Sequence, residues 1–429
     1  MKNTLNINWS EFLGLLFISS LGALVTFLRL SNGLRLSPDG WAYWEGSVSI
    51  LNGAGYRYFG GQAITDFPPL FSLFLCLPQL LFGVSGYTLV ATEIFLSAIT
   101  IFTWCSLLFL ISQKRHGYNY AQWLGAIWIC SFVSYHYYFL LSETLFLPLL
   151  AALLILEMIS QRGISVKLDS IYVGAIAVVT AMMCLTRNSS IAFLPAIAIL
   201  TTSQYGFKSA VFVMTLSLTS WSLVRWTMGS SHSHPISIGG KYDCLDYLIQ
   251  IIMGLSRHFA PRHRIGLLLI VLIILLYIIY LYQESNCGGP YNAIRNLCLF
   301  ILLGTLGLYT LFNLTYINST LSNRFIFYIP LGIVIILTAI ASVAKRPLMF
   351  AALVVLLAIT TIQSKETLSV ILSNSTPPGN NVQGWNIIKP NFFNMPPQPH
   401  GRMILISPPN YPWIVRSSNR AIHNGPVDK

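Results

Sequence analysis

Long apolar runs, each about 17–25 residues, recur along this chain with few charged residues between them. Only 9% of its 429 residues are charged, whereas soluble domains carry roughly 25%. So few charges leave too little polar surface to cover a water-soluble globule of this size. The composition therefore excludes a soluble enzyme, a disordered chain and a nucleic-acid-binding protein, and it predicts an all-α polytopic membrane protein.

The apolar runs predict about eleven transmembrane helices. The first, at 12–30, is too long for a signal peptide and lacks a small-residue cleavage site. A further run at 68–82 is short, begins with two prolines and contains Pro78, so we expect a shallow helix that does not cross the membrane. The remaining spans are expected at 87–112, 119–138, 142–160, 169–185, 189–204, 209–228, 265–282, 296–313, 325–344 and 347–363.

The basic residues assign a side to each connection between these spans. If 68–82 does not cross, the short cytoplasmic connections carry eight basic residues and the short external ones carry two, Arg187 and Arg324. A crossing helix would exchange these counts and break the positive-inside rule. The eight are Lys114, Arg115, Arg162, Lys167, Lys208, Arg295, Lys345 and Arg346. We therefore expect the first outer loop (31–86), the turn near Glu143, the loop 229–264 and the C-terminal tail on the outer face.

One shift in composition divides the chain. Residues 1–363 are expected to form the transmembrane domain, and 364–429, rich in Pro, Asn and Gly, a small external segment with a strand-like run at 403–406. In the loop 229–264, His232-Ser233-His234 fits no strong zinc signature, so a solvated loop with headgroup-facing bases is expected there.

The first outer loop holds the residues most suited to chemistry. It reads Ser37-Pro38-Asp39-Gly40-Trp41-Ala42-Tyr43 at its start, and Asp66-Phe67-Pro68-Pro69 before the shallow helix. Pro38 and Gly40 predict a turn that holds Asp39 at the lipid–water boundary, where its carboxylate can stay ionised and face a protein cavity. The alternative is that Asp39 caps a helix beginning at Trp41 and has no further role.

Taken together, these features resemble one enzyme group. They are an Asp just outside the first span, an aromatic residue four positions later, the Gly55-Tyr56 pair, and Pro-Pro opening a shallow helix. The chain in this way resembles the GT-C glycosyltransferases, integral membrane enzymes that include protein O-mannosyltransferases and aminoarabinose transferases. The resemblance covers about residues 10–200 and, more weakly, Asn323-Arg324.

This resemblance implies a GT-C-like fold and a sugar donor carried on a polyprenyl phosphate or diphosphate. It makes Asp39 the catalytic carboxylate, which takes the proton of an acceptor hydroxyl or amine as that group attacks the anomeric carbon, with inversion. Glu143, in Leu141-Ser142-Glu143-Thr144, matches an acidic residue of the family's second outer loop, which orients the acceptor or helps to bind a metal. Without the resemblance, Ser142 and Glu143 are explained as a helix-capping pair.

The resemblance also gives the outer arginines a role. Arg187, in Leu185-Thr186-Arg187-Asn188, matches the family's basic residue after the fifth span, and Arg324 has a similar outer placement. Both are candidates to bind the donor phosphate; the alternative for Arg187 is that it snorkels to lipid headgroups. Tyr43, Tyr56 and Asp66 are candidate substrate-binding residues. No ligand spacing indicates a metal, and the cofactor stays open.

Two other functions remain possible on the sequence alone. One is a lipid or solute transporter, although the span interiors are nearly free of charge apart from Glu93 and Glu157. The other is a polymerase or ligase for polyprenyl-linked glycans, which the basic loop 229–264 keeps open. For the glycosyltransferase we expect a lipid, glycan or protein acceptor, membrane lipids as partners, no nucleic acid, and a bacterial inner membrane.

Overall fold

The protein is seen here as a computed structural model, and all structural statements below concern the residues that it describes. These residues are 9–30, 34–36, 38–112, 120–160, 166–227, 244–260, 263–284, 290–314, 326–344, 346–373 and 386–388.

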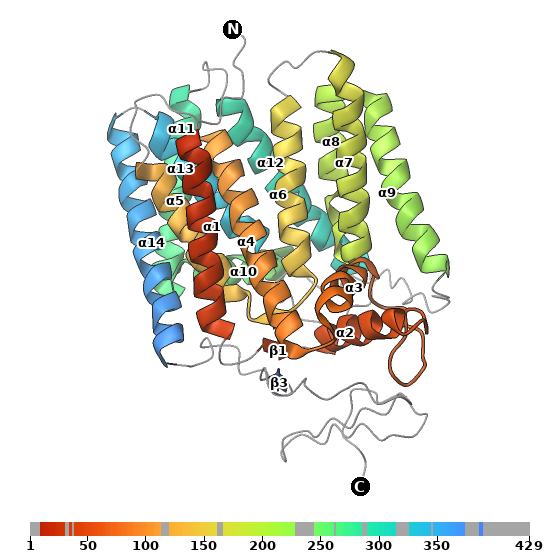
Figure 1. The fold of residues 1–429 in the computed structure, drawn as a ribbon. Coiled ribbons are helices and arrows are strands. Elements are labelled where there is room, and N and C mark those ends of the chain that lie inside the picture. The colour runs from red at the N-terminus through yellow and green to blue at the C-terminus, as the bar shows by residue number, and fades with distance from the viewer. Residues whose placement is uncertain are drawn as a thin grey trace.

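Eleven helices form an up-and-down bundle (Figure 1), and each predicted span falls on one of them. In chain order they are α1 (Trp9–Leu30), α4 (Gly86–Ile111), α5 (Tyr120–His136), α6 (Glu143–Ser160), α7 (Val166–Thr186), α8 (Leu194–Tyr205), α9 (Phe207–Thr227), α11 (His263–Glu284), α12 (Pro290–Leu314), α13 (Tyr328–Val343) and α14 (Arg346–Ser373). A 3-10 helix, η1 (Asn188–Phe193), precedes α8. Among the described residues, seven helices are long and apolar enough to cross a membrane: α1, α4, α7, α9, α11, α12 and α14. This establishes a multi-pass architecture, while the full count of eleven spans stays a prediction.

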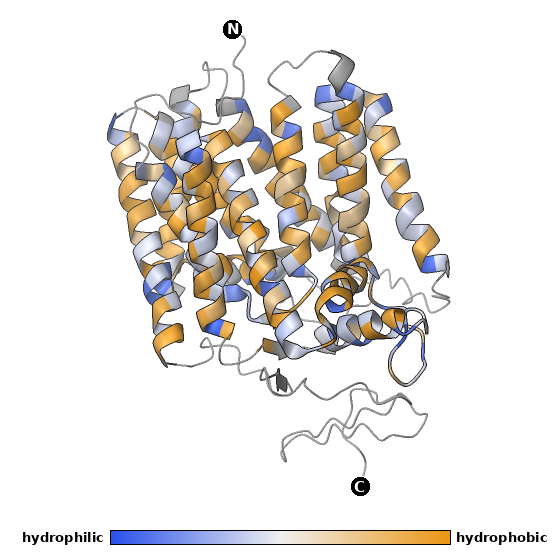
Figure 2. Cartoon of the chain, in the orientation of Figure 1, coloured by the Kyte–Doolittle hydropathy of each residue, from blue (hydrophilic) through white to orange (hydrophobic). Residues whose placement is uncertain are grey.

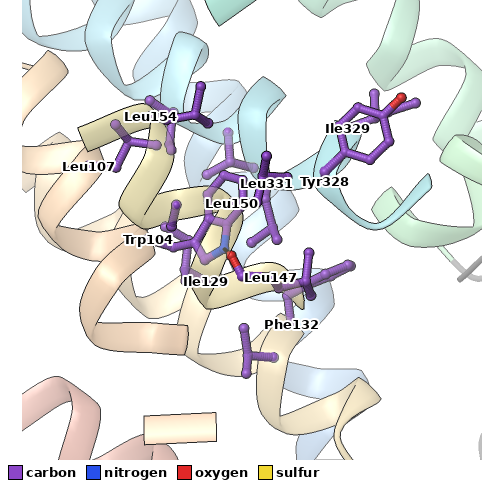
Figure 3. Packing of buried hydrophobic residues seen from close by; sticks show 14 of the residues in the cluster. Trp104, Leu107, Ile129, Phe132, Leu147, Leu150, Leu154, Tyr328, Ile329 and Leu331 are labelled. Atoms are coloured by element: carbon purple, nitrogen blue, oxygen red, sulfur yellow. Dashed lines mark hydrogen bonds between the residues drawn. The ribbon is translucent and has the colours of Figure 1, made fainter. Parts of the chain in front are cut away.

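The helices of the bundle are built largely of hydrophobic residues along their length, with hydrophilic residues more frequent toward the two ends (Figure 2). Large apolar residues such as Phe17 on α1 and Val271 on α11 are exposed, as expected for surfaces that face lipid. Inside the bundle, the fully buried Trp104 of α4 packs among aliphatic side chains of the neighbouring helices (Figure 3). Its indole Nε1 donates a hydrogen bond to the backbone oxygen of Leu147 in α6, at 3.1 Å. The tryptophan therefore fixes α6 against α4 without leaving a buried donor unpaired.

The short elements gather at one end of the bundle, which we call the α2 end (Figure 1). They are the helices α2 (Pro38–Leu51), α3 (Leu70–Phe82) and α10 (Cys244–Phe259), together with a small sheet. Helix α1 ends at the α2 end and α4 begins there, so α3, with only 13 residues, does not carry the chain across the bundle. The sequence predicts this end to be the outer one.

The sheet has three short strands in the order β2-β1-β3. Strand β1 (Leu34–Leu36) pairs in parallel with β2 (Phe139–Leu140) and antiparallel with β3 (Asn386–Ile388). Strand β3 thus joins part of the C-terminal segment to the first outer loop, while the strand-like run 403–406 lies outside the described residues. In this way the sheet brings three distant parts of the chain to the α2 end.

Two expectations about the connecting segments need correction. The predicted boundary at Gln363 falls inside α14, because Thr367 and Val370 continue its buried face and the helix runs to Ser373. Part of the loop 229–264 is also helical rather than a solvated loop, since residues 244–260 contain α10. Four side chains spaced four residues apart form its buried stripe and explain why it packs on the bundle: Tyr247, Ile251, Leu255 and Phe259.

Candidate active site

The parallel pair β1–β2 brings two of the predicted acidic residues to one place. Leu36 pairs with Leu140, and Asp39 and Glu143 follow this pair by the same number of residues in their own segments. Because the strands run in the same direction, both segments leave the sheet on the same side. Gly40 tightens this contact, since a Cβ atom at that position would come within 2.5 Å of the backbone oxygen of Leu140.

Asp39 lies in the first turn of α2 and is partly buried. The helix begins at Pro38, a residue suited to the first helical position because its missing N–H needs no partner there. Asp39 is therefore not the cap of a helix that begins at Trp41. Its carboxylate instead lies where the positive end of the helix dipole favours a negative charge.

Glu143 and Arg187 form a buried ion pair. Arg187 Nη1 lies 2.9 Å from Glu143 Oε1, and the two side chains are only 10% and 5% exposed. Arg187 follows α7 in an extended conformation, and Glu143 is the first residue of α6. A guanidinium held in this way does not snorkel to lipid headgroups. Since both charges are shielded from water, removing either partner would leave the other's buried charge without this ion pair.

Tyr43 marks the point at which the predicted charged residues converge. Its ring is buried, and its hydroxyl shares a hydrogen bond with Ser142. Burial raises the pKa of Tyr43 well above its ordinary value of 10, and the charges of Asp39, Arg187 and Glu143 all act on the same hydroxyl. The first outer loop and the α5–α6 turn therefore contribute to one electrostatic site.

Tyr43 and Tyr56, both predicted to bind substrate, have protein partners. The ring of Tyr43 contacts Phe67 and Phe71, with centroids 5.3 and 5.1 Å away. The Tyr56 hydroxyl lies 3.5 Å from the backbone oxygen of Pro68, and burial raises its pKa well above 10. Both rings help to hold α2 against the segment that leads into α3.

Asp66 belongs to a second group of charges around Tyr58. The charges of Asp66, Glu45 and Asp39 all raise the pKa of the Tyr58 hydroxyl, and together with burial, the largest cause, they bring it to about 12. The backbone oxygen of Asp66 accepts a hydrogen bond from Asn188 Nδ2 at 2.9 Å. Asp66 is thus held beside the segment that carries Arg187.

Two further acidic residues at this site were not among the predicted site residues. Glu45, on α2, accepts a hydrogen bond from the Phe59 N–H at 3.1 Å, and burial raises the pKa of its carboxyl from 4.5 to about 7. Glu93, on α4, is fully buried and accepts a hydrogen bond from Thr144 Oγ1 at 3.3 Å. Helix α4 begins at the α2 end, and Glu93 lies about two helical turns from its start. This short distance along the sequence is the signal that could have placed Glu93 near Glu143.

Arg324, His232 and His234 lie outside the described residues. Within the described part of the chain, no three His, Cys, Asp or Glu side chains gather in a way that could hold a metal ion.

His258 of α10 is buried, and its ring centroid lies 5.2 Å from that of His136 at the end of α5. This histidine pair attaches α10 to the bundle.

Comparisons with known proteins were informative only at the level of structure. No protein-family model and no curated protein matches the sequence. The crystal structure of ArnT from Cupriavidus metallidurans in the apo state aligns with a TM-score of 0.57 and 13% identity, over 86% of this chain and 78% of that one. The structure of ArnT from the same organism bound to undecaprenyl phosphate aligns with a TM-score of 0.56 and 13% identity, over 85% of this chain and 78% of that one.

At 13% identity these alignments establish the architecture. They cover most of the helical bundle, since 86% and 85% of this chain are aligned. The chain is therefore a multi-pass membrane protein that shares its fold with ArnT from Cupriavidus metallidurans.

Proposed function

We propose that this chain is a glycosyltransferase that moves a sugar from a polyprenyl-phosphate-linked donor to an acceptor at the α2 end of the bundle. One observation carries the proposal: at one end of an ArnT-like fold, the register of β1 and β2 brings the segment of Asp39 alongside that of Glu143, whose carboxylate lies 2.9 Å from Arg187 Nη1. An enzyme of this class needs a carboxylate base beside a cation that receives the leaving phosphate, and this site supplies both kinds of group.

In the proposed reaction, Asp39 takes the proton from the acceptor's hydroxyl or amine as that atom attacks the anomeric carbon. A bond forms from the acceptor to the sugar, and the bond from the anomeric carbon to the phosphate oxygen breaks. The electron pair leaves with the polyprenyl phosphate. A positioned base of this kind is worth about 10²–10⁴-fold in rate.

Arg187 is proposed to neutralise the charge that develops on the leaving phosphate. Its guanidinium contacts Glu143 in this structure, so a phosphate would either join that pair or displace the carboxylate. Glu143 would thereby orient Arg187 before the donor arrives. A guanidinium suits this task because its fork of N–H donors matches phosphate oxygens and it remains charged beside lipid.

The distribution of acids favours this proposal over a transporter. The transporter alternative rests on Glu93 and Glu157 as charges within the spans. Glu93 contacts Thr144, the neighbour of Glu143, and so belongs to the same end of the bundle as the proposed site. Glu157 also has a protein partner, since it accepts a hydrogen bond from Thr201 at 2.9 Å, between α6 and α8. Both acids of the span interiors therefore have contacts within the protein, which the transporter alternative does not need.

Undecaprenyl phosphate bound to an ArnT of the same fold supports a polyprenyl phosphate as the lipid partner. We further propose that the protein acts in the bacterial inner membrane, with the α2 end on the outer face. The acceptor would be a lipid, a glycan or a protein.

The test is a comparison of membrane glycolipids from cells with and without the gene, and with the Asp39→Asn variant. A sugar-modified lipid, glycan or protein that is lost in both the deletion and the variant supports the proposal. An unchanged glycoconjugate profile, together with no consumption of undecaprenyl-phosphate-linked sugars by the purified protein, contradicts it.

A further inference from the structure

Asn188 links the first outer loop to the segment that carries Arg187. It is the first residue of η1 and directly follows Arg187. Its Nδ2 donates to the backbone oxygen of Asp66 at 2.9 Å, and its Oδ1 accepts from Trp221 Nε1 of α9 at 3.1 Å. One side chain thus joins three parts of the chain that are far apart in sequence.

The chemistry of this link is particular to a carboxamide. An amide carries a donor and an acceptor on the same carbon, whereas a carboxylate only accepts and a hydrocarbon does neither. The backbone oxygen of Asp66 needs a donor, and the indole of Trp221 needs an acceptor. Leucine at this position would be similar in size but would break both bonds.

The link holds the segment that follows Asp66. The next residue, Phe67, packs its ring against Tyr43 at 5.3 Å, and the backbone oxygen of Pro68 lies 3.5 Å from the Tyr56 hydroxyl. On the other side of the link, Arg187 contacts Glu143 at 2.9 Å. Asn188 therefore connects the half of the site that contains Asp39 and Tyr43 to the half that contains the arginine.

The loop between α2 and Asp66 contains glycines whose backbone is conformationally permissive, and the hydrogen bond from Asn188 can restrict its movement. Gly53 and Gly55 have φ values of 74° and 81°, and a Cβ atom built on either would meet nothing within 4 Å. Glycine keeps such a segment conformationally permissive. The middle of the loop is held on α2, where the Phe59 N–H donates to Glu45 at 3.1 Å. The bond from Asn188 Nδ2 to the backbone oxygen of Asp66 ties the far end of the loop to the Arg187 segment.

We propose that Asn188 is a positioning residue: its carboxamide fixes the first outer loop against the Arg187 segment so that the site binds a lipid-linked phosphate. The inference rests on the proposed function, because it assigns the phosphate to Arg187. Asn188 acts through the backbone of Asp66 and through its direct neighbour in the chain.

The experiment compares Asn188→Leu with Asn52→Leu, using the full-length protein in lipid nanodiscs. Asn52 is exposed at the end of α2, in the same outer loop, so it controls for the loss of an amide. Two readouts are taken: affinity for undecaprenyl phosphate, and hydrogen–deuterium exchange of the peptide covering residues 54–66. Trp221→Phe, which removes only one of the two bonds, is measured beside them.

We expect Asn188→Leu to weaken undecaprenyl phosphate binding by about ten-fold and to raise exchange in residues 54–66, because misplacing a binding group by a small distance costs much of its contribution. Trp221→Phe should fall between wild type and Asn188→Leu, and Asn52→Leu should match wild type. Unchanged exchange or unchanged affinity in a folded Asn188→Leu protein overturns the inference. If wild-type protein itself fails to bind undecaprenyl phosphate, the proposed function fails, and the inference fails with it.

Discussion

Asp39 and Glu143 follow, by the same number of residues, the paired residues Leu36 and Leu140 of two parallel strands. This relationship explains how two carboxylates more than a hundred positions apart in sequence reach one site. The sheet is very short, so its contribution to stability is small. The sheet matters because it fixes the register of the two strands. A shift by one residue would turn the side chains of the shifted strand to the opposite face of the sheet.

The pairing also gives Arg187 a defined partner. Glu143 leaves β2 and enters α6 with its carboxylate 2.9 Å from Arg187 Nη1. Since α7 places Arg187 independently of the sheet, the ion pair joins the strand side of the site to the helix side. Under the proposed function, a cation held in this way would be positioned for the phosphate before the donor binds.

Asp39→Asn should abolish sugar transfer and leave folding near normal. The amide keeps the shape of the side chain but cannot take a proton. Loss of the charge in the first turn of α2 should cost only about 0.3–1 kcal/mol. The measurement is consumption of a polyprenyl-phosphate-linked sugar by purified protein, with the thermal unfolding midpoint as the check on folding.

Asp246→Asn is the matched control, because Asp246 is an exposed acid in the first turn of α10 at the same end. It should keep wild-type transfer. Retained transfer in Asp39→Asn would remove Asp39 as the base.

Arg187→Ala should destabilise the fold by about 3–5 kcal/mol, because it leaves Glu143 buried without its partner. Arg187→Lys keeps the charge and should remain folded, but a point charge cannot replace the bidentate fork. We therefore expect Arg187→Lys to bind undecaprenyl phosphate about ten-fold more weakly than wild type, as measured in nanodiscs.

The double variant Arg187→Gln with Glu143→Gln removes both charges and should recover much of the stability lost in Arg187→Ala. It should still fail to bind the phosphate tightly. Wild-type affinity in both Arg187→Lys and the double variant would show that the phosphate binds elsewhere.

Gly40→Ala should loosen the contact between α2 and β2. A Cβ atom at this position would lie 2.5 Å from the Leu140 backbone oxygen, so one of the two segments must move. We expect a loss of about 1–3 kcal/mol in the free energy of unfolding, together with reduced transfer. Gly174→Ala on α7 is the control, because nothing lies within 4 Å of its added Cβ atom. It should stabilise the protein by about 0.5–1 kcal/mol, and equal effects of the two substitutions would contradict the proposed contact.

Glu45 should make stability depend on pH between about 4.5 and 7. Its carboxyl has an ordinary pKa of 4.5 and a pKa of about 7 in the folded protein, so the folded state binds the proton more tightly. The stabilisation is fully present below pH 4.5 and is lost as the pH rises through 7. Glu45→Gln should flatten this dependence and raise stability at pH 8 by up to about 3 kcal/mol. Thermal unfolding in detergent at several pH values measures it, and parallel curves for the two proteins would argue against a buried carboxyl.

The α2 end should be reached by an impermeant thiol reagent added outside intact cells. In a background that carries Cys244→Ser, Asn52→Cys should be labelled and Lys208→Cys should not. Both positions are exposed in the structure, at opposite ends of the bundle. The eight-to-two distribution of basic residues in the short connections supports this orientation. Labelling of Lys208→Cys alone would reverse it.

The sequence alone determined the membrane class, the positions of the helices and the non-crossing helix at 68–82. Each follows from local information: the length of an apolar run, a proline, or the charge of a short connection. The resemblance to GT-C enzymes likewise came from a short local motif around Asp39, and the structural comparison confirmed the fold. The stripe of α10 was also present in the sequence at four-residue spacing, although a loop was expected there.

Only the tertiary structure decided which of these residues meet. The ion pair of Glu143 with Arg187, the link from Asn188 to Asp66 and the placement of Glu93 beside Thr144 join segments that are far apart along the chain. Such contacts depend on strand register and helix packing, which hydrophobic periodicity does not encode. For the same reason the sequence alone allowed Arg187 to be a headgroup-facing residue, whereas packing of α6 against α7 buries its guanidinium against a carboxylate.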